Sequence, residues 1–156
     1  DRFMFKLIVK YPDKDSERLV LRQNTKPLDL SKSKEVVSPD EILDAQRVIQ
    51  DIYVDEKVED YVLKLIFATR DPQDHGLNDL EGIIDFGASP RATINLVRAA
   101  KARAFTESRG YITPEDIRYI GADVLRHRVI LTYEAEAEEL TADDVIKRLF
   151  EVVEVP

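Results

Sequence analysis

The stretch GASPRATINLV, residues 87–97, begins the longest helix that the sequence predicts. Pro90 suits the first helical turn, because the N–H group that proline lacks would have no partner there. Apolar residues then recur at helical spacing to about residue 107, and Gly110 marks the end of the region. The side chains expected on the buried face of this helix are Ile94, Val97, Ala100, Ala104 and Phe105.

Arg91 departs from the usual electrostatics of a helix start. A cation in the first turn lies at the positive end of the helix macrodipole and is disfavoured by some tenths of a kcal/mol. One interpretation is that Arg91 points into solvent or pairs with an acid such as Asp85. The other is that an anion binds there, since first-turn N–H groups and a guanidinium together suit phosphate. The small residues Gly87-Ala88-Ser89 would let another surface come close.

Further helix starts flank this stretch and favour a helical bundle. A Ser or Thr followed by acidic residues occurs at 38–41, 113–116 and 141–144, and Pro occupies the first turn in the first two. A further helix starts near residue 55, and a short one is expected over 13–23. The expected apolar faces consist of Ile42, Ala45, Ile49 and Ile52, then Val58, Tyr61, Val62, Leu65 and Ile66, and finally Val145, Ile146, Leu149, Phe150 and Val153.

Four segments lack a helical pattern. Residues 3–10, FMFKLIVK, are rich in apolar and aromatic side chains and are predicted as a strand, whose pairing partners would have to lie in another sheet. A polar connector is expected from Asn24 to Lys34. Residues 70–88 contain three of the five glycines and are predicted as a long loop with Leu80, Ile83 and Ile84 turned inward. A short extended piece is expected within residues 126–131.

The composition is that of an ordinary globular protein, with 44% hydrophobic and 35% charged residues. The formal net charge of −8 opposes nucleic-acid binding, including by a helix-turn-helix around Gly110. The sequence contains no cysteine, which excludes disulfides and thiolate metal sites, and no apolar run approaches the roughly 20 residues of a membrane helix. We therefore expect a cytoplasmic protein with neither nucleic-acid nor membrane partners.

Other possible sites carry weaker signals. His75 and His127 have no metal ligands at the appropriate helical spacing, so no metal site is predicted. His127 lies between two arginines and suits a helix C-terminus. Ser89 lacks the strand and nucleophile elbow of a hydrolase triad. The acidic run 134–139 is typical of a solvated face.

Several strings, in order, resemble MoxR-type AAA+ ATPases. GASPRA at 87–92 resembles the family's sensor 2 segment, and LRHRVILTYEAEA at 125–137 resembles a segment near its C-terminus. DRFMF at 1–5 is similar to a string that closes the ATPase core. SPDEI at 38–42 and YITPED at 111–116 resemble its lid helices.

The resemblance implies a mainly α fold, a helical-bundle AAA+ lid domain preceded by a single orphan β-strand from a truncated α/β ATPase core. Residues 1–34 would be the core remnant, comprising the last strand, a short helix and a connector. Residues 35–156 would form the lid domain.

The resemblance also implies site residues. Arg91, with Ser89 and Pro90, would form the sensor 2 segment that contacts an ATP phosphate. Arg2 would resemble an arginine finger, acting on the nucleotide of a neighbouring subunit. The full-length protein would use ATP and Mg²⁺, assemble with copies of itself in a ring, and remodel a client protein through an adaptor.

The sequence contains no G-x-x-x-x-G-K-[ST] motif, so neither the phosphate cradle nor the magnesium ligand of a P-loop is present. We expect this chain alone to lack ATPase activity and to bind no cofactor. The alternative hypothesis is a non-enzymatic acidic helical module that binds a protein partner.

Overall fold

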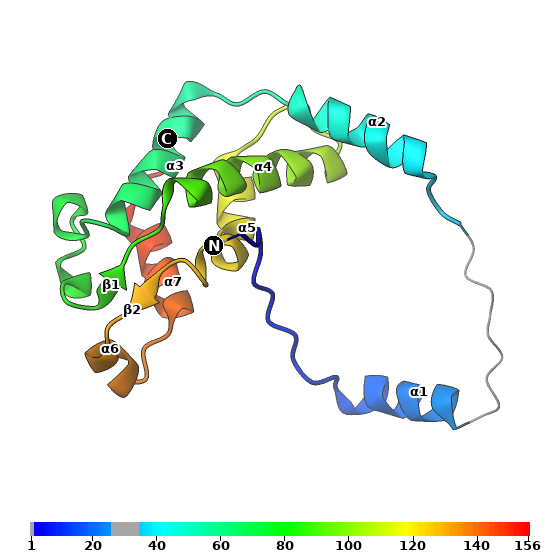
Figure 1. Cartoon of the computed structure of the whole chain (residues 1–156), viewed down its shortest axis with the longest axis horizontal. Helices are drawn as coiled ribbons and strands as arrows, with labels where there is room; N and C mark the ends of the chain where they lie inside the picture. Colours follow the sequence, from blue (N-terminus) through cyan, green and yellow to red (C-terminus); the bar gives the residue numbers. More distant parts are fainter. Residues whose placement is uncertain (1, 26–34) are drawn as a thin grey trace.

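The secondary structure is mainly helical (Figure 1). A computed structural model describes residues 2–25 and 35–156. The helices are α1 (Lys14–Asn24), α2 (Pro39–Gln50), α3 (Glu56–Ala68), α4 (Pro90–Thr106), α5 (Pro114–Leu125), α6 (Tyr133–Ala137) and α7 (Ala142–Val152). Two short 3-10 turns, η1 (Gln73–His75) and η2 (Asn78–Leu80), and two strands, β1 (Ile84–Phe86) and β2 (Ile130–Leu131), complete the described elements. The predicted mainly α fold is confirmed.

The helix starts follow the predicted local chemistry. The Ser38 side chain accepts a hydrogen bond from the Glu41 N–H, and the Glu41 carboxylate accepts one from the Ser38 N–H at 2.7 Å. Thr141 and Asp144 form the same reciprocal pair at the start of α7. These bonds satisfy N–H groups that have no partner inside the helix, which is why the starts of these helices were predictable.

The core lies between α3, α4, α5 and α7. The predicted face of α3 is buried, with Val62, Leu65 and Ile66 fully covered. The inward face of α4 consists mostly of small side chains, which lets α5 and α3 approach closely. The buried residues of α4 are Ala92, Leu96, Ala99, Ala100 and Ala104.

The predicted core face of α4 is partly wrong. Ala100 and Ala104 are buried as expected, but Ile94 is 50% exposed and Phe105 is 37% exposed. The larger apolar side chains were assigned to the core on size, whereas packing against α5 selects the alanine face. Ile94 therefore lies on the same outward face as Arg91.

The long segment between α3 and α4 is more ordered than a plain loop. Leu80 is buried and Ile83 and Ile84 are half-buried, in line with the predicted inward turn. β1 pairs antiparallel with β2, placing Ile84 opposite Leu131. This pairing joins two segments that are remote in the sequence, which is why local patterns did not predict β1.

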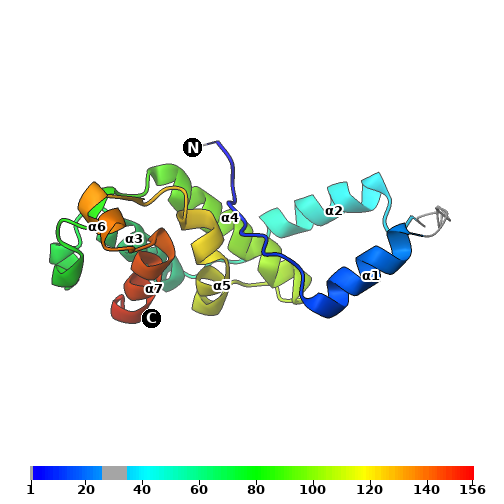
Figure 2. The same cartoon turned by 90° about the horizontal axis from the view of Figure 1, so that it is seen from below.

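The strand predicted for residues 3–10 is not formed. A strand requires a neighbour that shares its backbone hydrogen bonds, and among the described residues β1 and β2 pair only with each other. The segment instead crosses the body beside α4 and α5 (Figures 1 and 2), and the Lys6 N–H donates to the Asp123 carbonyl at 2.9 Å. The predicted connector falls mainly within residues 26–34, outside the described residues.

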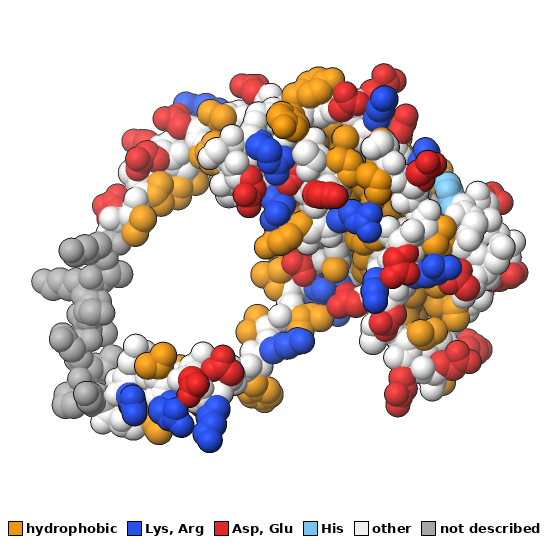
Figure 3. Space-filling view, turned by 180° about the vertical axis from the view of Figure 1, so that it is seen from behind, with side chains coloured by type: hydrophobic (Ala, Val, Ile, Leu, Met, Phe, Trp, Pro, Cys, Tyr) orange, Lys and Arg blue, Asp and Glu red, His pale blue; other side chains and the backbone are white. Residues whose placement is uncertain are grey.

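Helices α1 and α2 lie at the periphery, and neither contains a buried residue. The expected core face of α2 is only half-covered at Ala45 and Ile49, and Ile42 is exposed. Hydrophobic side chains are visible along α2 and on the adjoining surface of the body (Figure 3). Exposed apolar surface of this kind is typical of an interaction site.

Candidate phosphate-binding hollow

The start of α4 is fixed by contacts with the end of α3. The Ala88 N–H donates to the Thr69 hydroxyl at 2.9 Å, and Arg70 Nε donates to the Ala88 carbonyl at 2.8 Å. A Cβ atom at Gly87 would lie 2.4 Å from the Thr69 carbonyl oxygen. Only glycine allows the two backbones to approach this closely, so Gly87 sets the position at which the helix begins.

The first turn of α4 differs from those of its neighbours. Of α1 to α7 as the structure describes them, only α4 has no acidic residue in its first turn, and the Ser89 side chain makes no capping hydrogen bond. Pro90 occupies the first turn as predicted. Arg91 follows it, so the positive end of the helix carries a cation and no carboxylate. This combination favours an anion as ligand.

Arg2 and Arg91 line the same hollow, of about 470 Å³. Its other lining residues are Ile94, Asn95 and Arg98, which recur at helical spacing along the outward face of α4. Arg2 and Arg91 were predicted from the sequence as site residues, whereas Arg98 was not. Its position seven residues after Arg91, two turns along the same face, was the available signal. Three guanidinium groups at one hollow can bind an anion with several charged oxygens.

A larger and more apolar groove of about 1160 Å³ adjoins this hollow and shares Ile94 and Arg98 with it. Its walls come from the N-terminal segment, α2, α3 and α4, with Met4, Ile49 and Val97 among the lining residues. An apolar groove next to a cationic hollow suits a ligand with a flat apolar part and a polyanionic part.

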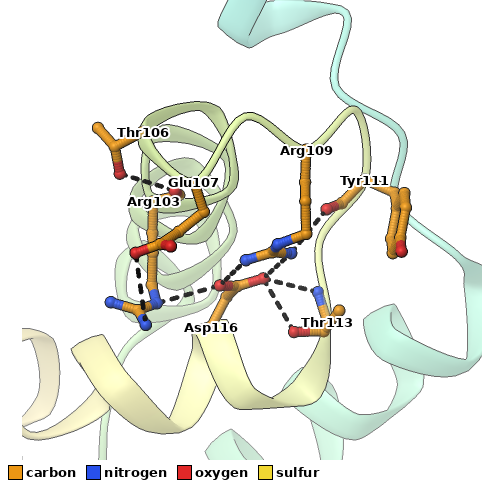
Figure 4. Close-up of polar contacts among 7 residues, drawn as sticks. All are labelled: Arg103, Thr106, Glu107, Arg109, Tyr111, Thr113 and Asp116. Carbon is orange, nitrogen blue, oxygen red and sulfur yellow. Dashed lines mark hydrogen bonds and ion pairs between the residues drawn. The ribbon is translucent and has the colours of Figure 1, made fainter.

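The far end of α4 is tied to α5 by a buried carboxylate (Figure 4). Asp116, which is 1% exposed, accepts hydrogen bonds from Arg109 at 2.6 and 2.8 Å, from Arg103 at 3.1 Å and from the Thr113 N–H at 2.8 Å. Burial alone raises the pKa of Asp116, but the bonds from Arg109 and Thr113 outweigh it and hold the pKa below its ordinary value. Arg103 also lies over the Tyr119 ring, with its Cζ atom 3.4 Å from the ring centroid.

Neither histidine lies at this hollow. The Nε2–H group of His127 donates a hydrogen bond to the Phe3 carbonyl oxygen at 3.1 Å. No cluster of three or more His, Cys, Asp or Glu side chains suited to a metal occurs within residues 2–25 and 35–156. Every helix in this same part of the chain is too short or too polar to cross a membrane.

Residues 80–149 match the family described as the AAA lid domain. This range includes all of α4 and α5. The chain is 38% identical over its whole length to the chaperone MoxR1 of Mycobacterium tuberculosis, of which it covers 41%. Over 67% of its length it is 36% identical to the protein MoxR of Methylorubrum extorquens. The crystal structure of a candidate ATPase from Cytophaga hutchinsonii superposes on 99% of the chain with a TM-score of 0.91 and 39% identity.

The chain belongs to the MoxR-type AAA+ ATPases. It covers 47% of the Cytophaga hutchinsonii protein, so it spans less than half the length of these relatives. The resemblance predicted from the sequence strings is confirmed, and Arg2, Ser89, Pro90 and Arg91 all lie within the region shared with the MoxR1 chaperone. This membership favours an AAA+ lid over a free-standing acidic interaction module.

Proposed function

We propose that this chain is the lid of an ATP-hydrolysing MoxR-type subunit, and that Arg91 is its sensor 2 arginine. The carrying observation is the hollow at the start of α4, where the helix end, Arg91 and Arg98 present positive charge to one volume. Ser89 is the N-cap of α4 and Pro90 its first residue, and we propose that they orient Arg91 toward the phosphate. In the full-length protein these residues would bind the terminal phosphates of ATP.

The residues at this site fit a nucleotide. The arginines would hold phosphate oxygens, and the adjoining apolar groove, lined by Val97 and Met4, is large enough for a base. ATP supplies the phosphoryl group that is transferred to water, and Mg²⁺ would neutralise part of its charge. Since no acidic metal cluster occurs among the described residues, we propose that the Mg²⁺ ligands lie elsewhere in the full-length protein.

Arg2 is the second arginine that we assign to hydrolysis. An arginine that approaches the transferred phosphoryl group stabilises the charge that develops there. The family resemblance implies that Arg2 acts on the nucleotide of a neighbouring subunit. Its place beside Arg91 in one chain supports the competing arrangement, in which both arginines serve the same nucleotide.

We further propose that the full-length protein forms a ring and remodels a client through an adaptor. The uncovered apolar side chains of α1 and α2, such as Leu19, Ile42 and Leu43, support contact with the ATPase core or with a neighbouring subunit. The naming of one relative as a chaperone supports a client. Inactivity of this chain by itself and a cytoplasmic location stay predictions.

The sensor assignment is tested by Arg91→Ala in the full-length protein. We expect ATP turnover to fall by about 100-fold, because a group that positions and stabilises the transferred phosphate is lost. Arg148→Ala is the matched control, since Arg148 forms an exposed ion pair with Asp79 away from the hollow. Turnover that is unchanged in Arg91→Ala would refute the assignment.

Mixed rings separate the two arrangements of Arg2. Subunits carrying Arg2→Ala are combined with subunits carrying Arg91→Ala. If Arg2 acts on the neighbour's nucleotide, some sites in mixed rings contain both arginines and activity returns. If both arginines serve one nucleotide within one subunit, each site lacks one of them and the mixture stays inactive.

A further inference from the structure

The backbone of the N-terminal segment is held by three consecutive side chains. Arg128 Nη2 donates to the Phe3 carbonyl at 2.5 Å, and Arg128 Nη1 donates to the Met4 carbonyl at 3.0 Å. His127 Nε2 donates to the same Phe3 carbonyl at 3.1 Å. The contacts join residues more than 120 positions apart in the sequence, and we call residues 126–128 the RHR clamp.

Arg126, the first residue of the clamp, contacts the segment two residues further on, at Lys6. Its Nη1 donates to the Lys6 carbonyl at 2.5 Å, while ion pairs with Asp123 and Asp143, at 2.8 and 2.7 Å, hold the guanidinium in place. The Lys6 N–H completes the contact by donating to the Asp123 carbonyl. The backbone of residues 3–6 is therefore held at successive points by groups at the end of α5.

The side chains of the segment contribute little to its docking. Phe3 is 81% exposed and Leu7 is 65% exposed, and among described residues 2–10 only Met4 is half-buried. Arg128, by contrast, is 5% exposed. Its planar fork donates to carbonyl groups of the segment and to the Val124 carbonyl in α5, which compensates for the burial of its charge.

We propose that the RHR clamp is a positioning device that holds Arg2 at the hollow shared with Arg91. The Phe3 carbonyl, gripped by both His127 and Arg128, lies one residue from Arg2. Since hydrogen bonds to backbone carbonyls fix the path of a chain regardless of its side chains, the clamp sets where Arg2 emerges. The catalytic consequence rests on the function proposed above, whereas the docking geometry does not.

The docking is tested first in this 156-residue chain. Because the chain lacks cysteine, Asn95→Cys at the hollow gives a single site for a nitroxide spin label. In NMR spectra we expect the label to broaden the amide signals of Phe3 and Phe5. This broadening should be lost in Arg128→Lys, because an ammonium group cannot reproduce the hydrogen bonds of the planar guanidinium. In Arg128→Lys, the Lys6 amide hydrogen should also exchange with solvent about 10- to 100-fold faster than in the original chain.

Lys6→Pro tests the same docking from the other partner. It removes the N–H that donates to Asp123 and leaves the lid core untouched, so a release of the segment cannot be attributed to unfolding. We expect the broadening of the Phe3 signal to be lost here as well. Arg148→Lys, the same exchange of side chains at a surface ion pair, should leave it unchanged. If the Phe3 signal stays broadened in both Arg128→Lys and Lys6→Pro, the inference is overturned.

The full-length protein tests the consequence for catalysis. Arg128→Lys should lower kcat for ATP about 10- to 100-fold with little change in KM, as expected for a misplaced group that acts in the transition state. In an Arg2→Ala background it should have no further effect on kcat. If Arg128→Lys lowers kcat in the Arg2→Ala background as much as it does alone, the positioning role is overturned. If Arg2→Ala alone leaves kcat unchanged, the proposed function of Arg2 fails, and the spin-label result still reports the docking separately.

Discussion

Asp116→Asn should destabilise the chain markedly, because Asp116 is the buried acceptor for two arginines at the junction of α4 and α5. Breaking a buried ion pair costs about 3–5 kcal/mol when the remaining charge is fully enclosed. Here Arg103 and Arg109 keep 25% and 26% side-chain exposure and can turn toward water. The asparagine oxygen can still accept from Thr113. We therefore expect a loss of about 2–3 kcal/mol.

Thermal unfolding followed by circular dichroism measures this loss. For a chain of this size each kcal/mol corresponds to about 2–4 °C, so the midpoint should fall by about 4–12 °C. Asp79→Asn is the matched control. The Asp79–Arg148 pair is equally short, at 2.6 Å, but about half exposed on both sides, so its loss should lower the unfolding midpoint far less. Equal effects of the two substitutions would refute the argument from burial.

The pH dependence provides a second check on Asp116. Its pKa in the folded chain lies below its ordinary value of 3.8, so the contribution to stability is fully present above that value. It is lost as pH falls through the lower folded pKa, because the folded state must then take up the proton. The difference in stability between the original chain and Asp116→Asn should thus be constant near neutral pH and shrink below pH 3.8.

Two glycine substitutions test close packing. In Gly87→Ala the new Cβ would meet the Thr69 carbonyl at 2.4 Å and push the start of α4 away. We expect a loss of about 3 kcal/mol of stability, measured from the unfolding midpoint, and a lower ATP turnover of the full-length protein. Gly121→Ala should cost less, about 1–2 kcal/mol, and urea unfolding measures it. The atom 2.2 Å from its new Cβ belongs to the side-chain ring of the partly buried Phe150, which can shift more easily than backbone. Gly110→Ala, with no atom within 4 Å, is the control for both and should change stability by less than about 0.5 kcal/mol.

The helix starts were predictable because their causes are local. Ser38 and Thr141 make their capping bonds within one turn of the chain, so residue type and spacing suffice to place α2 and α7. The face of α4 was harder, because Ile94 and Val97 satisfy a helical pattern as well as the alanines do. Only the neighbouring helix decides which face is buried.

The candidate site was predictable in part. The string that contains Ser89, Pro90 and Arg91 marked one side of the hollow, and Arg2 was named from a resemblance at the opposite end of the sequence. The meeting of Arg2 with Arg91 depends on the clamp at residues 126–128. No local pattern reveals that arginines there would bind carbonyl groups of residues 3–6.

The sequence by itself determined where most helices begin, the family to which the chain belongs, and the cation at the start of α4. Those features depend on neighbours within a few residues or on the order of short strings. The tertiary structure alone decided that the segment predicted as a strand is docked by side chains, that Asp116 joins two arginines, and that Gly87 must lack a Cβ. Each depends on groups brought together across 7 to 125 positions, where packing and hydrogen-bond geometry select the partner.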